Sequence, residues 1–215
     1  MAELRPGSRI ILDLDDTLYS EREFERSGFA TMLDVLDIRH TVELDTLVQL
    51  SAQGQDIFTY LEFDTHLKNV ALSIYRSHLP SISLYADAAI FIEQALEAQC
   101  QLVLATEGRS LTQRNKIAAL GLEEKFSHIL ISEEVGHTKV HEAFFADLTD
   151  IPAGTQVVMI GDNPIKDFLV PNRHGWETYM LASRGNNVHR QDIDVDDQYR
   201  AQHVIHSFSE LNFGS

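Results

Sequence analysis

Two aspartates directly follow a short apolar segment near the beginning of the chain. Residues Arg9–Leu12 lead into Asp13 and Asp15. Because side chains alternate in direction along a strand, both carboxylates are expected on the same side of its end. Carboxylates so close together repel each other unless a cation lies between them or one holds a proton. Hard oxygen ligands at this place favour Mg²⁺, which also accepts substrate phosphate oxygens. By itself, the segment is equally compatible with a turn rich in aspartate.

Two groups that could bind phosphate follow later apolar segments. Thr106 follows the segment 102–105, and its hydroxyl could hold a phosphoryl oxygen. Lys139 follows the segment 129–132, near the start of a predicted helix. Its ammonium could neutralise a phosphoryl group and keep two carboxylates apart. Taken alone, a threonine after a strand is unremarkable, and such a lysine usually lies on the surface.

A last acidic pair follows the apolar segment 157–160. Gly161 permits a tight exit from a strand, Asp162 is then placed as a metal ligand, and Asp167 lies about one helical turn further on. Any one of these features could arise by chance. Four groups in this order, each after a predicted strand, indicate a single site that binds a metal ion and phosphate.

The elements that must position these groups are those of a parallel α/β fold. Short apolar segments alternate with segments of helical periodicity. Strands that are apolar on both faces are typical of a parallel sheet covered by helices on both sides, and ligands bind at the carboxyl ends of such strands. The predicted strands are Arg9–Leu12, Gln101–Ala105, Ile129–Ser132, Val157–Ile160, Glu177–Leu181 and His203–Ile205, and the predicted helices are Ala86–Ala98, Ser110–Leu120, His141–Leu148 and Pro164–Arg173.

A long helical segment interrupts this alternation. From about residue 20 to residue 80, apolar residues recur at spacings of three and four without a strand pattern between them. The segment is long enough for three or four helices. We therefore expect two parts, an α/β core of residues 1–18 and 81–215 and a small all-helical domain of residues 19–80.

The segment Ser183–Arg200 is polar and is expected to be a solvated loop. Its aspartates include Asp192 and Asp194 at alternating positions. The glycine and glutamate of a Ca²⁺-binding loop do not occur at the required offsets, which argues against such a site.

Composition and charge exclude several classes of function. The formal net charge is −16, and such a chain repels nucleic acid and anionic membranes at long range. No apolar stretch approaches the roughly 20 residues that span a bilayer, and Met1–Arg9 lacks the pattern of a signal peptide. Cys100 is the single cysteine and is expected in the core. A cytoplasmic protein, monomeric or homodimeric, is therefore expected.

The chain resembles the haloacid dehalogenase superfamily over essentially its whole length. Val140 follows Lys139 where proline is frequent in the family, a difference that touches no catalytic position. The resemblance is carried by four motifs in family order, which are Asp-x-Asp-x-Thr from Asp13 to Thr17, the strand that ends in Thr106, the isolated Lys139, and Gly-Asp-x-x-x-x-Asp from Gly161 to Asp167.

This resemblance implies a Rossmann-like parallel sheet, with the helical insertion as a cap over the site. It implies that Asp13 is the nucleophile and becomes an aspartyl-phosphate. Asp15 would protonate the leaving oxygen and later deprotonate water. Thr106 and Lys139 would bind the phosphoryl oxygens.

The resemblance also implies Mg²⁺ as the cofactor. Its ligands would be the Asp13 carboxylate, the backbone carbonyl of Asp15 and the Asp162 carboxylate. Asp167 would be a further ligand or would support one. The expected activity is hydrolysis of a small-molecule phosphomonoester.

Other functions of the same or a related fold remain open. A phosphomutase or phosphotransferase would have the same core, and a non-catalytic phosphate-binding protein is possible on any enzyme fold. A dehalogenase lacks the second aspartate of the first motif, so Asp15 argues against it. A phospho-accepting signalling domain lacks both the helical insertion and the motif around Asp162. The sequence does not identify the substrate.

Overall fold

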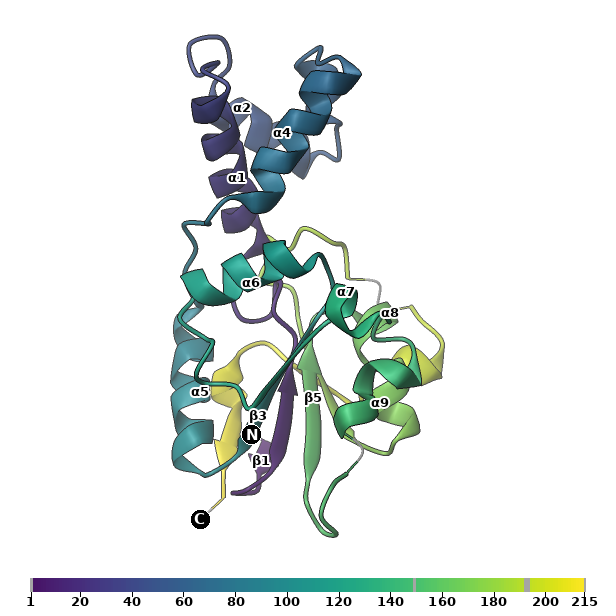
Figure 1. Ribbon diagram of the computed structural model, residues 1–215. Helices are drawn as coiled ribbons and strands as arrows, with labels where there is room; N and C mark the ends of the chain where they lie inside the picture. The colour runs from purple at the N-terminus through teal and green to yellow at the C-terminus, as the bar shows by residue number, and fades with distance from the viewer. Residues whose placement is uncertain (1, 149, 192–193, 215) are drawn as a thin grey trace.

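The computed structural model describes residues 2–148, 150–191 and 194–214, and its centre is a six-stranded parallel sheet (Figure 1). The strand order is β4-β3-β2-β5-β6-β7, with every neighbouring pair parallel. This is the predicted Rossmann-like architecture. The strands are β2 Arg9–Leu12, β3 Gln101–Thr106, β4 His128–Ile131, β5 Val157–Gly161, β6 Glu177–Leu181 and β7 His203–Ile205.

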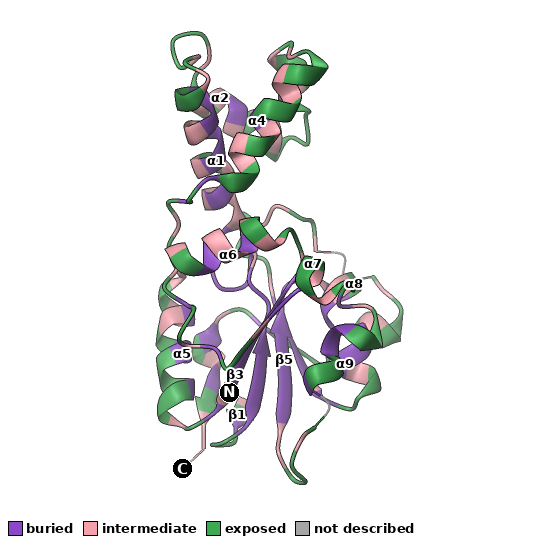
Figure 2. Cartoon of the chain, in the orientation of Figure 1, coloured by how far each residue is buried: buried purple, intermediate pink, exposed green. Residues whose placement is uncertain are grey.

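The two faces of the sheet are buried under different helices, as Figure 2 shows for the central strands. Ile10 and Leu12 belong to the apolar cluster that contains α5 (Ala86–Glu97) and α6 (Ser110–Ala119). Ile11, between them, belongs to the opposite cluster with the aromatic residues Phe144 and Trp176. The period-two alternation of strand side chains explains this division. Because helices cover both faces, β2 has no exposed residue.

The helical insertion rises from the carboxyl edge of the sheet (Figure 1). Its helices pack around a separate apolar cluster that includes Phe29, Met32 and Leu47. α1 contacts both α2 and α4, so a few turns of helix share one small core. The elements are α1 Glu21–Val35, α2 Leu44–Ala52, α3 Ile57–Tyr60 and α4 Thr65–Ser77.

Two predicted helices differ in the structure. Residues Glu142–Leu148 form the 3₁₀ helix η1 instead of an α-helix, and apolar spacings of three and four fit either form. The segment Pro164–Arg173 is split into α8 (Pro164–Asp167) and α9 (Leu169–Arg173). Pro171 has no N–H to donate to the carbonyl of Asp167, which removes one of the bonds that would continue a single helix.

Five short elements were not predicted, and one of them is the 3₁₀ helix η2 (Asp197–Tyr199). β1 (Ala2–Leu4) pairs in parallel with β8 (Leu211–Phe213), so the two ends of the described chain lie side by side. α7 (Ser132–Val135) follows β4 directly, and the 3₁₀ helix η3 (Phe208–Glu210) precedes β8. Three or four residues are too few for a periodic pattern. Within the described ranges, none of the helices has the length and apolarity required to cross a membrane.

Candidate active site

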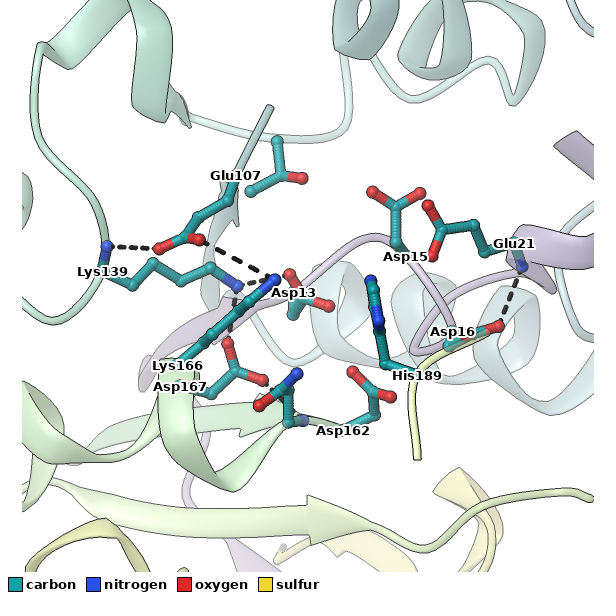
Figure 3. A pocket seen from close by; sticks show the side chains of 12 residues that line it. Asp13, Asp15, Asp16, Glu21, Glu107, Lys139, Asp162, Lys166, Asp167 and His189 are labelled. Carbon is teal, nitrogen blue, oxygen red and sulfur yellow. Dashed lines mark hydrogen bonds and ion pairs between the residues drawn. The ribbon is translucent and has the colours of Figure 1, made fainter. Parts of the chain in front are cut away.

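A small polar cavity lies at the carboxyl edge of the sheet, where β2, β3 and β5 end (Figure 3). All six residues that the sequence predicted for the site line it, so the structure brings them together. The remaining lining residues come mainly from the same loops and from the start of α1. The cavity is lined by Asp13, Asp15, Asp16, Glu21, Thr106, Glu107, Lys139, Asp162, Asn163, Lys166, Asp167 and His189.

Asp13 and Asp167 share one buried cation. The ammonium of Lys139 donates to Asp13 Oδ1 at 2.5 Å and to Asp167 Oδ1 at 2.6 Å. Lys139 is only 2% exposed, so water screens these ion pairs weakly. The hydroxyl of Thr17 donates to the other oxygen of Asp13 at 3.1 Å. The lysine therefore separates two carboxylates, as the sequence predicted.

Gly161 makes room for this arrangement. A Cβ atom at this position would lie 2.3 Å from Asp167 Oδ2. Asp167 in turn accepts a hydrogen bond from the backbone N–H of Asn163 at 2.9 Å, which fixes the loop after β5. Glycine is thus required here by close approach of the Asp167 side chain.

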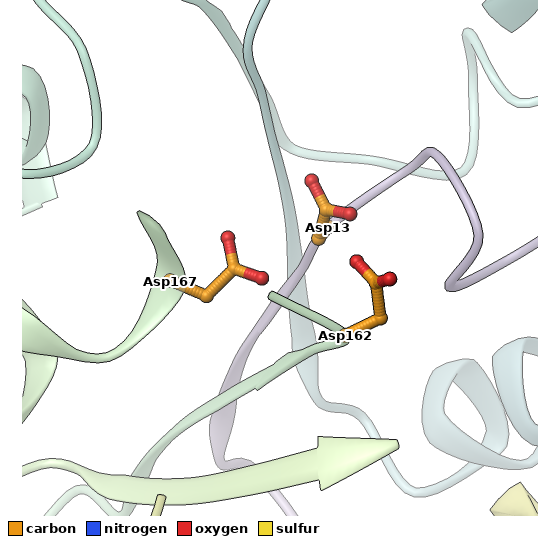
Figure 4. Close-up of side chains that lie close together, drawn as sticks. All are labelled: Asp13, Asp162 and Asp167. Carbon is orange, nitrogen blue, oxygen red and sulfur yellow. The ribbon is translucent and has the colours of Figure 1, made fainter. Parts of the chain in front are cut away.

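Asp13, Asp162 and Asp167 offer carboxylate oxygens that all lie within 4.8 Å of one another (Figure 4). Burial and neighbouring carboxylates raise the pKa of Asp13 to about 7. The same causes raise the pKa of Asp162 to about 9. Lys139 alone does not balance three buried carboxylates. Oxygen ligands, close spacing and missing positive charge are the properties that a site for Mg²⁺ requires, so these residues fit that ion.

Asp15 lies in a different environment on the other side of the cavity. Its Oδ1 accepts hydrogen bonds from Lys116 Nζ at 2.7 Å and from the hydroxyl of Tyr19 at 2.5 Å. Its Oδ2 accepts from Gln113 Nε2 at 2.9 Å. Burial favours a raised pKa for Asp15, but the Lys116 ammonium and these hydrogen bonds outweigh it and lower the pKa. Asp15 is therefore held as a carboxylate, the form that can accept a proton from water.

The polar segment after β6 also reaches the site. Asn187 donates to Asp162 Oδ2 at 2.8 Å, and the N–H of Val188 donates to Asp16 Oδ2 at 2.6 Å. His189 follows and lines the cavity. These residues form a loop, as predicted, and His189 is exposed, but the contacts that Asn187 and Val188 make with the site were not predicted. Asp192, part of the aspartate cluster noted in the sequence, lies outside the described residues.

The sequence analysis missed the residues that surround Asp15. Gln113 and Lys116 lie on α6, where a single polar residue looks like part of a solvated helix face. Their spacing of three places them on one side of the helix, beside the buried Ile117. This spacing was the feature of the sequence that could have indicated a shared contact for the two side chains. Tyr19 is the first residue of the predicted insertion, and its contact with Asp15 was not predicted.

Several curated proteins are similar to this chain along nearly its full length. Glyceraldehyde 3-phosphate phosphatase of Methanocaldococcus jannaschii is 25% identical over 221 residues, with 94% of each chain covered. Ribulose-1,5-bisphosphate 5-phosphatase of Halopiger xanaduensis is 22% identical and covers 95% of this chain and 98% of its own. Phosphoserine phosphatase of Thermus thermophilus is 38% identical over 86 residues, which are 39% of this chain and 34% of that protein.

Solved structures share the fold. The HAD-hydrolase YfnB of Bacillus subtilis, in a crystal structure bound to magnesium, aligns with a TM-score of 0.69 at 17% identity and covers 96% of this chain and 97% of its own. A HAD family hydrolase of Deinococcus radiodurans with bound phosphate and sodium aligns with a TM-score of 0.65 at 17% identity, covering 96% and 94%. The sequence pattern of the haloacid dehalogenase-like hydrolases matches residues 10–180. These matches confirm the predicted family, and the chain belongs to the haloacid dehalogenase-like hydrolases.

Proposed function

We propose that this chain is a Mg²⁺-dependent phosphatase that hydrolyses a small-molecule phosphomonoester through phosphorylated Asp13. The observation that carries the proposal is the position of Asp13. Its carboxylate lies at the end of β2, bonded to the buried ammonium of Lys139 and close to the carboxylates of Asp162 and Asp167. The negative charge of these carboxylates is not neutralised by Lys139 alone. A nucleophile in such surroundings suits a phosphate ester that binds together with a metal ion. Family membership and the phosphatase names of the similar proteins support the same reaction class.

In the first step an Asp13 oxygen attacks phosphorus, and the bond from phosphorus to the leaving oxygen breaks. Asp15, a carboxylate in the free chain, takes up the proton of a singly protonated phosphate ester as the ester binds and then donates it to the leaving oxygen. In the second step water attacks the phosphorylated Asp13 while Asp15 removes a proton from that water. Inorganic phosphate leaves, and Asp13 is a carboxylate again. The Thr106 hydroxyl and the Lys139 ammonium supply hydrogen bonds to the phosphoryl oxygens, which carry the charge of the transition state.

Asp13, Asp162 and the backbone carbonyl of Asp15 would hold the Mg²⁺, with Asp167 as a further ligand or as a support through Lys139. When bound, the ion would supply positive charge against both the carboxylates and the phosphoryl oxygens. Asp162 is itself oriented by Asn187, so the loop after β6 contributes to this site.

We further propose that residues 19–80 act as a cap over the cavity, attached to a core of residues 1–18 and 81–215. Glu21, in the first turn of α1, already lines the cavity. Closure of such a unit would exclude water and place groups near the leaving group. A small metabolite fits this cavity better than a macromolecule, and the acidic chain disfavours nucleic acid. A cytoplasmic monomer or homodimer remains our expectation.

A phosphate-release assay tests the proposal. The purified chain should be incubated with Mg²⁺ and a panel of phosphorylated metabolites, including triose phosphates, phosphoserine, pentose bisphosphates and nucleotides, and with an aryl phosphate. We expect inorganic phosphate to be released from the aryl phosphate and from a subset of the panel. Formation of an isomeric phosphate ester without release of inorganic phosphate would instead assign a phosphomutase. No turnover of any ester would overturn the proposal.

A further inference from the structure

Gln113 and Lys116 of α6 are buried, although most of the polar residues on this helix reach solvent. They are 1% and 3% exposed, and they lie three residues apart on one side of the helix. Burial of an ammonium group costs free energy unless the group is paired with an opposite charge and hydrogen-bonded. Their partners therefore indicate what the two side chains do.

The amide of Gln113 has two N–H donors, and it divides them between two groups of the site. Nε2 donates to Asp15 Oδ2 at 2.9 Å and to Thr106 Oγ1 at 2.5 Å. The reverse orientation of the amide would place its oxygen against a carboxylate, which can only accept, so the contacts fix the orientation. Because Thr106 Oγ1 accepts from Gln113, its own proton is free for another acceptor. That proton is the one a phosphoryl oxygen needs.

Lys116 holds the other oxygen of Asp15 and ties it to the first helix of the insertion. Its Nζ lies 2.7 Å from Asp15 Oδ1, 3.9 Å from Glu21 Oε1 and 4.2 Å from the centre of the Phe24 ring. Together with the hydroxyl of Tyr19, these donors engage both carboxylate oxygens from different directions. Rotation of the Asp15 side chain would break at least one of these bonds.

The same helix supports the end of the helical insertion. Thr112 Oγ1 donates to the carbonyl of Arg76 at 2.9 Å, and Asn115 Nδ2 donates to the carbonyl of Ser77 at 3.0 Å. α6 therefore contacts the proposed cap with the partly buried Thr112 and Asn115, and it contacts Asp15 with the buried Gln113 and Lys116. This helix therefore links the position of Asp15 to the position of the proposed cap.

We propose that Gln113 and Lys116 are positioning residues for this enzyme, which fix the carboxylate of Asp15 and, through Gln113, direct the hydroxyl of Thr106 toward the phosphoryl group. This inference rests on the proposed phosphatase function. Neither side chain needs to touch the substrate. Without them Asp15 remains present but is no longer held at the leaving oxygen, so turnover falls while substrate binding persists.

The test uses two variants that keep shape and remove donors. Gln113→Glu replaces the amide by an acceptor, and Lys116→Met removes the charge at similar length. Matched controls are Gln94→Glu on α5 and Lys125→Met, whose ammonium pairs with Glu93 outside the site. Turnover is measured with an alkyl phosphate that the wild type hydrolyses and with 4-nitrophenyl phosphate, and folding is followed by circular dichroism.

With the alkyl phosphate we expect kcat to fall about 10²-fold in either variant, the loss that misplacement of a catalytic group by about 1 Å can cause, with KM within about threefold of wild type. With the aryl phosphate, whose leaving group needs less protonation, the loss should be at least about fivefold smaller. In an Asp15→Asn background, adding Lys116→Met should change kcat by less than about threefold, because the residue acts through Asp15.

Equal losses with both substrates, a change in KM alone, or variants that behave like their controls would overturn the inference. If either Gln113→Glu or Lys116→Met fails to fold, the remaining single variant and the double variant in the Asp15→Asn background still test the inference. A wild type that hydrolyses no phosphate ester would reject the proposed function. An active wild type with unaffected variants would reject only the role of Gln113 and Lys116.

Discussion

The two sides of the cavity are built in opposite ways, although Asp13 and Asp15 belong to one loop. The Asp13 side joins the ends of β2 and β5, and it holds three neighbouring carboxylates, of which Asp13 and Asp167 share the ammonium of Lys139. The Asp15 side is made by the start of the insertion and by α6, and the carboxylate of Asp15 receives three donors there. The Asp13 side therefore lacks positive charge, whereas Asp15 is already paired with the ammonium of Lys116.

The electrostatic consequences differ in sign. Burial and like charges raise the pKa of Asp13 and of Asp162. Lys116 lowers the pKa of Asp15 against the effect of burial. On the side of Asp13, where a cation and the phosphate ester are proposed to bind, the chain does not supply enough positive charge by itself. Asp15, the proposed acid and base, receives all of its hydrogen-bond donors from the chain. The predictions below test that division.

Removal of metal should have the largest effect, because it acts on the incomplete side. At an effective dielectric of about 20, two like charges 4 Å apart repel by about 4 kcal/mol, so a dianionic phosphate should not bind among these carboxylates unaided. Chelation should therefore eliminate phosphatase activity, and Mg²⁺ should restore it. Ca²⁺ should restore it poorly because of its looser coordination. Full activity after exhaustive chelation would show that Lys139 alone balances the site.

Asp13→Asn should reduce kcat by at least about 10³-fold with little change in shape, because it removes the charge of the attacking oxygen. A steady-state assay with the aryl phosphate measures the loss. Asp197→Asn is a matched control, since its side chain is 93% exposed and pairs only with Arg200 among the contacts described. Activity of Asp13→Asn within tenfold of wild type would mean that this aspartate is not the nucleophile.

The stability of the metal-free protein should depend on pH through the carboxylates whose pKa is raised, chiefly Asp13 and Asp162 and, beside Asp15, Glu21. The usual pKa of an aspartate is 3.8, and those of Asp13 and Asp162 are raised to about 7 and about 9. Above pH 3.8 the unfolded chain holds fewer protons than the folded one, so stability falls as pH rises toward these values. Asp15 has the opposite sign, and its contribution is lost as pH falls below 3.8.

Thermal unfolding at pH 5 and pH 8, with and without Mg²⁺, checks this expectation. Mg²⁺ should raise Tm more at the higher pH, where it compensates ionised carboxylates instead of competing with protons. Asp162→Asn should reduce the difference between the two pH values. An equal rise of Tm at both would contradict the assigned direction of the shifts.

Asn187→Ala should have the smallest effect of the set. It removes the hydrogen bond that orients Asp162 but leaves every proposed ligand in place. We expect the Mg²⁺ concentration for half-maximal rate to rise about 10-fold, with kcat at saturating Mg²⁺ nearly unchanged. Asn186→Ala is the control, because Asn186 donates to Ser20 instead. The same response in both variants would attribute the effect to the loop as a whole.

The sheet and the Asp13 side could be predicted because both depend on local patterns. Each of the six strands is apolar on both faces. On the Asp13 side, Asp13 and Asp162 follow strand ends directly, and Lys139 and Asp167 lie further along the segments that follow strand ends. Three of the strands were predicted to the residue, namely Arg9–Leu12, Glu177–Leu181 and His203–Ile205. Parallel strands bring their carboxyl ends to one edge, so sequence order sufficed to place these groups together.

The Asp15 side could not be predicted because its partners are distant in sequence and lie on a helix. Gln113 is 98 residues from Asp15, and Lys116 is 101 residues away. Which face of α6 meets the cavity depends on how that helix packs between the sheet and the insertion. A polar residue on a helix gives no indication of this by itself. The contact of Asn187 with Asp162 could not be predicted either, because a loop has no periodic pattern that would indicate which of its residues reach the site.

The most direct measurement of the central claim is the capture of the phosphorylated intermediate on Asp13. In Asp15→Asn the first step with 4-nitrophenyl phosphate needs little protonation, whereas activation of water is lost. After a brief reaction with Mg²⁺ and an acid quench, peptide mass spectrometry should find one phosphoryl group, located on Asp13 and absent without Mg²⁺. Release of phosphate by the wild type, with no phosphoryl group on Asp13 in this variant or with the group on another residue, would contradict the account.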